Sequence, residues 1–473
     1  MSARKRKTDE NGIEKPVVFI RTFGCQMNTY DSQVAAGILE KAGFEIAVEG
    51  EGTGDGVLIS GRPSISQGAD IVLMNTCSVR DHAEERVWGR LGLLGAEKKE
   101  RPELVIGLMG CMVEEHREKL FKRFPYLDLM VGTRHIKELP EMIRQVYETR
   151  KQIVRIKQDG ISIEYSEFTK RDTGFHAWLP IMTGCNKECT FCIVPMTRGT
   201  EVSMPAGEVC REVRRLVADG VKWITLLGQN VNSYNGQGTG NGERGTSEAT
   251  FPELLEMLCK IDGLDRLSFT TSHPQDATEE LFQVIARNPK IGRRFHLPLQ
   301  SGSDRILKRM KRFHTYAEYK SKIDRLRELV PEISITTDII VGFPGETDED
   351  HRATRRALEE IRFDGAYIYK YSLRPGTPAA RLPDDIPLEV KTSRNRELLL
   401  VQQKITEEKS RSLLGKVFTV FVEGRGTDHP KEQVGRMDQD RRVVFEADQS
   451  YAGQFIRMEL TGLHHETFRA KLV

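Results

Sequence analysis

Three cysteines with the spacing C-x3-C-x2-C follow a short apolar run: Cys185, Cys189 and Cys192. The apolar run, Trp178–Met182, is typical of a buried strand. A chain that turns after a strand brings nearby thiolates to one point, and thiolate is the usual ligand of iron–sulfur clusters. Because three protein ligands on a four-iron cluster leave one iron open, the pattern favours a cluster that binds a substrate or cofactor.

Two other interpretations of these cysteines are three buried structural thiols and a zinc site. A structural zinc ion normally takes four ligands, often as two C-x2-C pairs, and the sequence has no second pair. The spacing resembles that of the radical S-adenosylmethionine (SAM) superfamily. This resemblance implies that SAM chelates the open iron and is cleaved by an electron from the cluster to a 5′-deoxyadenosyl radical. It also implies that Phe191 lies near the adenine, with core packing as the alternative role.

The composition is that of a globular protein with room for about three domains, since the chain has 473 residues, 38% of them hydrophobic. The formal net charge is only +2, so any basic surface for nucleic acid must be local. No apolar run reaches the ~20 residues that cross a membrane, and no signal-peptide core follows the first residues. Eight cysteines in this length favour a reducing cytoplasm over a disulfide framework.

Three further cysteines each follow a β-like run near the N-terminus. The runs are Val17–Gly24, Ile71–Thr76 and Leu104–Gly110, and the cysteines are Cys25, Cys77 and Cys111. Helical patterns over Asp31–Ala42 and Asp81–Lys99 separate the runs, which predicts a doubly wound parallel sheet. Ligands gather at the carboxyl ends of such strands, so the three thiols are expected to converge. One such cysteine is usually a small buried side chain, whereas three in equivalent positions predict a second cluster.

Six strand-then-helix units follow and predict an open, partial (β/α)6 TIM-type barrel. The expected strands are Trp178–Met182, Trp223–Leu227, Arg266–Thr270, Arg294–Pro298, Ile333–Val341 and Tyr367–Ser372. The expected helices are Ala206–Asp219, Pro252–Ile261, Glu279–Ala286, Asp304–Lys311, Tyr316–Leu329 and Asp348–Ile361. Polar or glycine-containing loops follow all six strands, where such barrels carry their function. The candidates for SAM binding are Phe191, Gln229, Asn230, Gln300, Ser301, Gly342 and Glu346.

The C-terminal part begins with a charged helix expected over Leu388–Leu413. Short alternating strands follow and predict a small β-barrel: Val417–Val422, Arg441–Phe445, Phe455–Leu460 and Phe468–Leu472. The predicted domains are therefore residues 15–150, 171–400 and 411–473. Basic residues gather around Asp304–Lys311, where helical spacing puts Arg305, Lys308, Arg309 and Arg312 near one face. Such a face contacts RNA phosphates or is simply solvated.

Several stretches resemble the methylthiotransferases, a radical SAM family, and the resemblance covers nearly the whole chain. Near the N-terminus the matching stretches are Thr22–Asn28, Asn75–Arg80 and Gly110–Met112. Three later stretches are similar to the MiaB-type methylthiotransferases of transfer RNA (tRNA): Gly228–Tyr234, His296–Ser303 and Tyr371–Ala380. The sequence departs from the family at Met204, where arginine is usual, and in the glycine-rich insert Gly236–Gly245.

The resemblance implies conversion of N6-isopentenyladenosine beside the anticodon into 2-methylthio-N6-isopentenyladenosine. It implies two [4Fe-4S] clusters, SAM and a C-terminal RNA-binding TRAM domain, in which Arg425, Lys431, Arg436, Arg441 and Arg442 meet phosphate. The implied partners are the tRNA anticodon stem-loop, a flavodoxin or ferredoxin, and sulfur or cluster donor proteins, with no membrane. The alternatives are a methylthiotransferase for threonylcarbamoyl-adenosine or a ribosomal protein, and a non-catalytic iron–sulfur carrier with an RNA-binding tail.

Overall fold

The structure is a computed structural model that describes residues 14–47, 58–59, 62–63, 66, 68–78, 81–117, 119–156, 169–236, 249–426, 429 and 431–473. The chain divides into two compact units. The first runs to Asp172 and adds the short segments Thr183–Cys185 and Ile193–Val202, and the second contains the remaining residues. The insert Gly236–Gly245 lies almost entirely outside the described residues, and the predicted domain boundaries stay a prediction.

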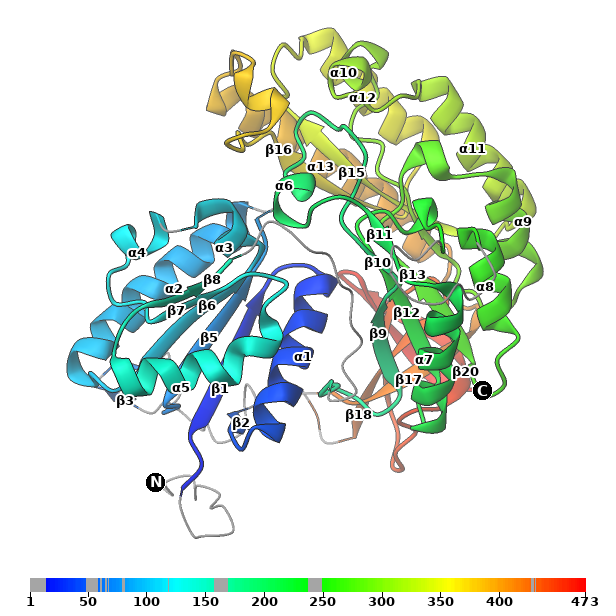
Figure 1. Cartoon of the computed structure of the whole chain (residues 1–473). Coiled ribbons are helices and arrows are strands. Elements are labelled where there is room, and N and C mark those ends of the chain that lie inside the picture. Colours follow the sequence, from blue (N-terminus) through cyan, green and yellow to red (C-terminus); the bar gives the residue numbers. More distant parts are fainter. Residues whose placement is uncertain are drawn as a thin grey trace. The chain divides into compact units, whose positions relative to one another are not determined.

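The first unit is built on a six-stranded, all-parallel sheet (Figure 1). Its strands are β1 (Val17–Phe23), β2 (Glu45–Ala47), β5 (Ile71–Thr76), β6 (Val105–Gly110), β7 (Leu129–Val131) and β8 (Ile153–Arg155). The order β2-β1-β5-β6-β7-β8 means that the chain leaves β1 toward one edge and then builds toward the other. The strand order therefore reverses between β1 and β5, which is where ligands bind in open α/β sheets.

Helices cover both faces of this sheet, as the alternating strand and helix patterns predict. Figure 1 shows α1 (Gln26–Lys41) and α5 (Leu139–Thr149) together on one face, with α2 (Asp81–Glu100) on the other. Apolar residues of α2 pack on alternate residues of β1, β5 and β6 in a dry core. The remaining elements are β3 (Leu58–Ile59), β4 (Arg62–Pro63), α3 (Cys111–His116), α4 (Lys119–Arg123) and the 3-10 turn η1 (Ile136–Glu138).

The three predicted strands of this unit are confirmed to within one residue, but the first helix begins earlier than predicted. It starts at Gln26 rather than Asp31, directly after Cys25. The side chain of Asn28 accepts a hydrogen bond from the Cys25 N–H (3.3 Å), which caps the helix at that point. Sequence patterns also missed β2, β7 and β8, because each is only three residues long.

The second unit contains six parallel strands in two sheets of three. They are β9 (His176–Pro180), β12 (Trp223–Leu227), β13 (Arg266–Phe269), β14 (Arg294–His296), β15 (Ser334–Val341) and β16 (Gly365–Lys370). The orders are β9-β12-β13 and β14-β15-β16, and a single parallel bridge between Leu267 and Ile291 continues the series. This is the predicted partial barrel, with its strands in sequence order.

The barrel helices lie where the sequence predicts them, within two residues at each end. They are α7 (Ala206–Ala218), α8 (Phe251–Cys259), α9 (Glu279–Arg287), α10 (Asp304–Arg309), α11 (Tyr316–Leu329) and α12 (Asp348–Ile361). Capping boxes fix the starts of three of them, at Thr250, Thr315 and Thr347. The prediction was too long for α10: the helix ends at Arg309, so Arg312 does not share its face.

The C-terminal part is helix α13 (Leu388–Arg411) followed by a closed five-stranded barrel. Its strands are β17 (Val417–Arg425), β18 (Glu432–Met437), β19 (Arg442–Glu446), β20 (Phe455–His464) and β21 (Thr467–Leu472). Apolar residues on alternate positions of all five strands fill its interior. Sequence patterns missed β18, because its polar and glycine residues hide the alternation.

The small barrel packs on the parallel strands through charged and aromatic contacts. The guanidinium of Arg266 lies over the rings of Trp223 (5.1 Å) and Phe455 (4.9 Å) and pairs with Asp438. Two of the arginines that were expected to contact RNA phosphates form ion pairs within the protein instead. Arg436 pairs with Glu423 and Asp440, and Arg441 pairs with Asp364. Their cationic groups are therefore committed to holding the fold.

The partly buried imidazole of His176 on β9 gives the second unit a predicted acid sensitivity. The ring packs between Trp178 and Trp223 and shares a hydrogen bond with Thr225 (2.9 Å). Burial lowers its pKa to about 4, while Asp440 raises it and Arg436 lowers it further. Because the unfolded imidazole binds its proton near pH 6.5, stability should fall by about 3 kcal/mol between pH 6.5 and 4.

We expect His176→Phe to abolish this part of the acid dependence in urea unfolding of the metal-free protein. The exposed His464→Phe variant should retain the full dependence of the parent. Equal pH slopes for His176→Phe and the parent would contradict the assignment.

Candidate functional site

Cys25, Cys77 and Cys111 lie at the carboxyl ends of three neighbouring strands, as predicted. Cys25 ends β1 and begins α1, Cys77 follows β5, and Cys111 begins α3 directly after β6. The Cys77 N–H donates to the carbonyl of Phe23 (3.0 Å), which continues the β1–β5 ladder to the cysteines. Two of the three cysteines thus flank the point where strand order reverses.

Asparagine side chains hold the ends of β1 and β5 together. Asn28 donates to Asn75 (3.0 Å), and Asn75 in turn donates to the Asn28 carbonyl (2.7 Å) and to Ser32 (2.9 Å). Both asparagines are completely buried, so breaking either would leave polar groups without water. Gly110 completes the arrangement: its φ is +96° and a Cβ there would lie 2.4 Å from the Asn75 oxygen.

The environment of Cys25 favours the thiolate form. A hydrogen bond from Cys77 lowers the pKa of Cys25 to about 6, opposed by burial and helped by Arg198 and by the N–H groups of Asn28 and Met27. The thiols of Cys25 and Cys77 are therefore in contact. Thiolate is the form that binds metal, so the site is prepared for a ligand role at neutral pH.

Cys111 has a cationic partner that sequence reasoning did not assign to it. The Nε of Arg198 donates to the Cys111 sulfur (3.3 Å), and Nη2 donates to Asp31 (2.8 Å). Burial raises the pKa of Cys111, and Arg198 opposes this shift. Arg198 and Asp31 are each only 6% exposed, so this ion pair is nearly dry.

The donor set fits a multi-iron cluster better than a single ion. All three are free thiols, and they do not form a group whose ligand atoms all lie within 4.8 Å. Among the described residues, Glu84, Glu115 and His116 are the group that is this compact, and they contain no thiol. In a cluster each thiolate binds a different iron, so the three thiols need not meet at one point.

Cys185 follows β10 (Met182–Thr183) in a turn that packs with the first unit. Its N–H donates to the carbonyl of Gly199 (3.1 Å), just beyond the short helix α6 (Val194–Thr197) and before β11 (Val202–Ser203). Gly184 makes the turn possible, since its φ is +76° and a Cβ would lie 2.0 Å from the Thr200 carbonyl. The position of Cys185 is therefore fixed by Gly199 and Thr200, which follow Cys189 and Cys192 in the sequence.

Cys189, in the second unit, receives two hydrogen-bond donors from barrel loops. Nη1 of Arg312 lies 3.3 Å from its sulfur, and Nη2 donates to the Pro298 carbonyl (2.7 Å). Nε2 of His273 lies 3.9 Å away; because Nδ1 accepts the Gln275 N–H, Nε2 carries the proton. Burial lowers the pKa of His273 to about 2, so the ring is neutral. Arg312 is thus buried against the Cys189 sulfur, which corrects its expected place on an RNA-facing helix.

The predicted SAM-binding residues fall into two kinds. Buried acceptor atoms of Asn230 (Oδ1), Gln300 (Oε1) and Glu346 (Oε1) have no hydrogen-bond partner in the described part of the chain. Ser301 is instead fully engaged, with Thr354 and the Ser303 N–H, and the Gly342 N–H donates to the other Glu346 oxygen (2.7 Å). Ser301 and Gly342 therefore shape the loops.

Two further candidates have less distinctive surroundings. Phe191 packs against the cluster of Ile306, Met310, Phe343, Tyr371 and Ala379, and Gln229 is partly buried.

Glu346 also forms a buried ion pair with Arg394 (2.7 Å), which balances the negative charge of its carboxylate. The three orphaned acceptors follow β12, β14 and β15, at the barrel end where ligands bind. They fit a ligand rich in N–H and O–H donors, as SAM is.

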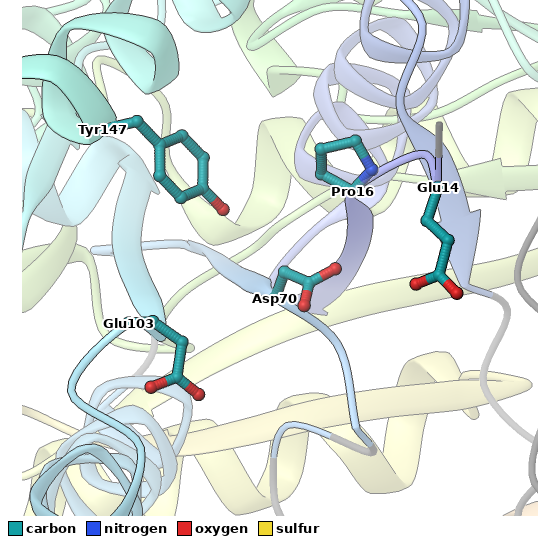
Figure 2. A pocket seen from close by; sticks show the side chains of 5 residues that line it. All are labelled: Glu14, Pro16, Asp70, Glu103 and Tyr147. Carbon is teal, nitrogen blue, oxygen red and sulfur yellow. The ribbon is translucent and has the colours of Figure 1, made fainter. Parts of the chain in front are cut away.

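A cavity of about 320 Å³ lies in the first unit, away from the cysteines. Figure 2 shows its lining residues: Glu14, Pro16, Asp70, Glu103 and Tyr147. Pro16, Asp70 and Glu103 precede β1, β5 and β6, so this cavity is at the amino edge of the sheet. Its carboxylates repel phosphate, and the polar chemistry lies at the opposite, carboxyl edge, which we take as the functional one.

Comparison with known proteins places both cysteine sites in recognised sequence families. Residues 179–358 match the radical SAM superfamily, and residues 17–61 and 62–132 match an uncharacterized protein family, UPF0004. A tRNA-2-methylthio-N(6)-dimethylallyladenosine synthase of Dictyoglomus thermophilum is 44% identical over 94% of this chain and 96% of its own. The synthases of Carboxydothermus hydrogenoformans (40%; 94% and 96%) and Aeromonas hydrophila (42%; 96% and 91%) match similarly.

Solved structures share the fold at low identity. A radical SAM methyltransferase, TsrM, from Kitasatospora setae has a TM-score of 0.53 at 15% identity, covering 88% of this chain and 80% of that one. No helix in the described part of the chain is long and apolar enough to cross a membrane.

Iron content tests both cysteine sites directly. If each site takes one four-iron cluster, the parent should hold about eight irons per chain after anaerobic reconstitution. The triple variants Cys25/Cys77/Cys111→Ala and Cys185/Cys189/Cys192→Ala should each retain about four. Cys210→Ala and Cys259→Ala, which remove buried thiols from α7 and α8, are the matched controls and should retain about eight. Eight irons in either triple variant would refute the ligand assignment.

Proposed function

This chain belongs to the radical SAM family of tRNA-2-methylthio-N(6)-dimethylallyladenosine synthases, and we propose that it performs their reaction. It would convert N6-isopentenyladenosine beside the anticodon of tRNA into the 2-methylthio derivative. The observation that carries the proposal is the convergence of Cys25 and Cys77 with Cys111 and its partner Arg198 at the carboxyl edge. Sulfur transfer needs a second thiolate site for an auxiliary cluster, and this edge would supply it.

Each cysteine set is proposed to hold one [4Fe-4S] cluster, with one iron left open. The spacing of Cys185, Cys189 and Cys192 supports the SAM-binding cluster, and the sheet edge supports the auxiliary one. When bound, the clusters and SAM supply electron transfer, a carbon radical and sulfur, which amino-acid side chains do not offer. An aromatic C–H has no acidic proton for a general base, which explains why such cofactors are required.

The protein's own residues orient and shield this chemistry. Arg198 at Cys111, and Arg312 and His273 at Cys189, place N–H donors on thiolates in nearly dry surroundings. Such donors stabilise charged sulfur and tune the bound metal. Asn230 and Gln300 offer buried acceptors for the amine and hydroxyl groups of SAM, and Ser301 and Gly342 hold the loops that present them.

We propose tRNA as the macromolecular partner, recognised by the shape and splayed bases of its anticodon stem-loop. The five-stranded barrel supports this as a TRAM-like module, although Arg436 and Arg441 are engaged in ion pairs. Lys431 is also paired, with Asp448 (2.7 Å). Arg425 and Arg442 form no ion pair within the described chain and are the remaining phosphate candidates. A flavodoxin or ferredoxin would supply electrons, sulfur or cluster donor proteins would restore the auxiliary site, and the tRNA substrate implies the cytoplasm.

Nucleoside analysis of tRNA tests the proposed reaction. In a bacterial strain that lacks its own enzyme of this family, the parent gene should restore 2-methylthio-N6-isopentenyladenosine. Cys77→Ala should leave only N6-isopentenyladenosine, because a two-thiolate site cannot hold the auxiliary cluster. Cys259→Ala is the matched control and should restore the product.

Other outcomes of the same analysis separate the alternatives. Restored methylthio-threonylcarbamoyl-adenosine, with no isopentenyl product, would overturn the substrate assignment. No methylthio nucleoside at all, together with no 5′-deoxyadenosine from SAM and dithionite, would favour the iron–sulfur carrier.

The role of Gln300 is open to a binding measurement. Its backbone is held in a left-handed conformation (φ 73°) by hydrogen bonds to Asp338 and Ile340, which leaves the side-chain oxygen buried without a partner in the described chain. We expect Gln300→Leu to weaken SAM binding about tenfold, the loss of about one hydrogen bond, with unchanged iron content. Equilibrium dialysis with the reconstituted protein measures this, and the exposed Gln283→Leu variant on α9 is the control. Equal affinities would remove Gln300 from the SAM site.

A further inference from the structure

Arg198 contacts Cys111 with its side chain and is followed by Gly199, whose carbonyl accepts the Cys185 N–H. It lies six positions after Cys192 in the sequence, within the segment Ile193–Val202 that packs with the N-terminal sheet. Its side chain donates to Cys111 (3.3 Å) and Asp31 (2.8 Å). A guanidinium that is 6% exposed is stable only with such partners, so its position is tightly specified.

The backbone around Arg198 holds the turn of Cys185. The Arg198 carbonyl accepts a hydrogen bond from Arg134 (3.1 Å), and the next carbonyl, of Gly199, accepts the Cys185 N–H (3.1 Å). Gly199 has φ +79°, and a Cβ there would lie 2.4 Å from the Arg134 guanidinium. The segment therefore has little freedom to shift at one end without shifting at the other.

We propose that Arg198 is a positioning residue for both cysteine sites: its side chain sets the charge at Cys111, and its anchored backbone holds the adjoining Gly199 carbonyl that places Cys185. The proposal rests on the proposed function only in taking the N-terminal thiols as cluster ligands. Occupancy or reduction of the N-terminal site is then linked to the geometry of the Cys185 turn.

The charge of Arg198 should change the reduction potential of an N-terminal cluster in a definite direction. A reduced cluster carries one more negative charge than an oxidised one, so an N–H donor with positive charge favours reduction. Asp31 acts in the opposite direction, since its carboxylate lies against the same guanidinium. Removing Arg198 should therefore disfavour reduction, and neutralising Asp31 should favour it.

A redox titration isolates this effect from activity. The full chain with Cys185, Cys189 and Cys192 replaced by Ala holds only the N-terminal cluster, whose reduced signal is followed by electron paramagnetic resonance during dithionite titration. We expect Arg198→Gln to lower the ratio of reduced to oxidised cluster about tenfold at fixed potential, which is 59 mV for one electron. Asp31→Asn should shift the midpoint upward, and Arg198→Lys should lie between the parent and Arg198→Gln.

A purely structural role of Arg198 would not shift the midpoint potential in opposite directions in Arg198→Gln and Asp31→Asn. The exposed Arg144→Gln variant on α5 is the control and should leave the midpoint unchanged. If Arg198→Gln fails to hold the cluster, Arg198→Lys and Asp31→Asn still decide the sign. Unchanged midpoints, or shifts of the same sign, would overturn the electrostatic role.

The backbone half is tested on the metal-free parent chain by the rate at which Cys185 is alkylated, measured by mass spectrometry. We expect Arg198→Gln and Arg134→Gln to raise this rate severalfold relative to that of Cys210, because both loosen the 198–199 turn. Unchanged rates in both variants would refute the link to Cys185. If the variants show the redox shifts but the parent makes no methylthio nucleoside, the proposed function alone fails. If the parent makes the nucleoside but the variants show no redox shifts, this inference alone fails.

Discussion

The rest of this structure depends on one property of parallel sheets: all strands end at the same edge. Cys25 and Cys77 are far apart in the sequence, yet they end neighbouring strands and their thiols meet. The reversal of strand order between β1 and β5 opens the edge at that point, because the two connections leave in opposite directions. The partial barrel uses the same property, since the loops bearing Asn230, Gln300 and Glu346 all follow parallel strands.

A thiolate at such an edge needs donors as well as position. Burial alone raises the pKa of a thiol, as it does for Cys111, so charged sulfur is stable there only beside N–H groups or cations. The chain supplies Arg198 in one unit, and Arg312 with a neutral His273 in the other. Each arginine also has a second partner, Asp31 or the Pro298 carbonyl, which fixes the direction of its N–H bonds.

Sequence patterns predicted most of the long strands and helices, because periodicity is a local signal, and ligand spacing singled out the six cysteines as candidates. They missed β18, which is polar, and several strands of two or three residues, among them β2, β7 and β8. They also began α1 five residues late, because the Asn28 cap is not visible in apolar spacing. The role of Arg312 was also missed: a basic residue in a basic cluster reads as surface, and only the fold shows that it is buried at Cys189. Sequence comparison also could not show the role of Met204, where the family usually has arginine. In the structure Met204 lies in the core, and its carbonyl accepts a hydrogen bond from the Tyr234 hydroxyl (2.6 Å).

The two cysteines outside the sites show why each cluster would keep an open iron. A fourth thiolate would close the cluster, and the chain has two more thiols, Cys210 on α7 and Cys259 on α8. Burial raises the pKa of both, that of Cys259 to about 11, so they remain protonated and poor metal ligands at neutral pH. Helix faces that pack in the core hold them, whereas the six ligand candidates lie at or just beyond strand ends. The same burial that stabilises the helices therefore makes these two thiols poor candidates for a fourth ligand, in keeping with the open iron that the proposed reaction requires.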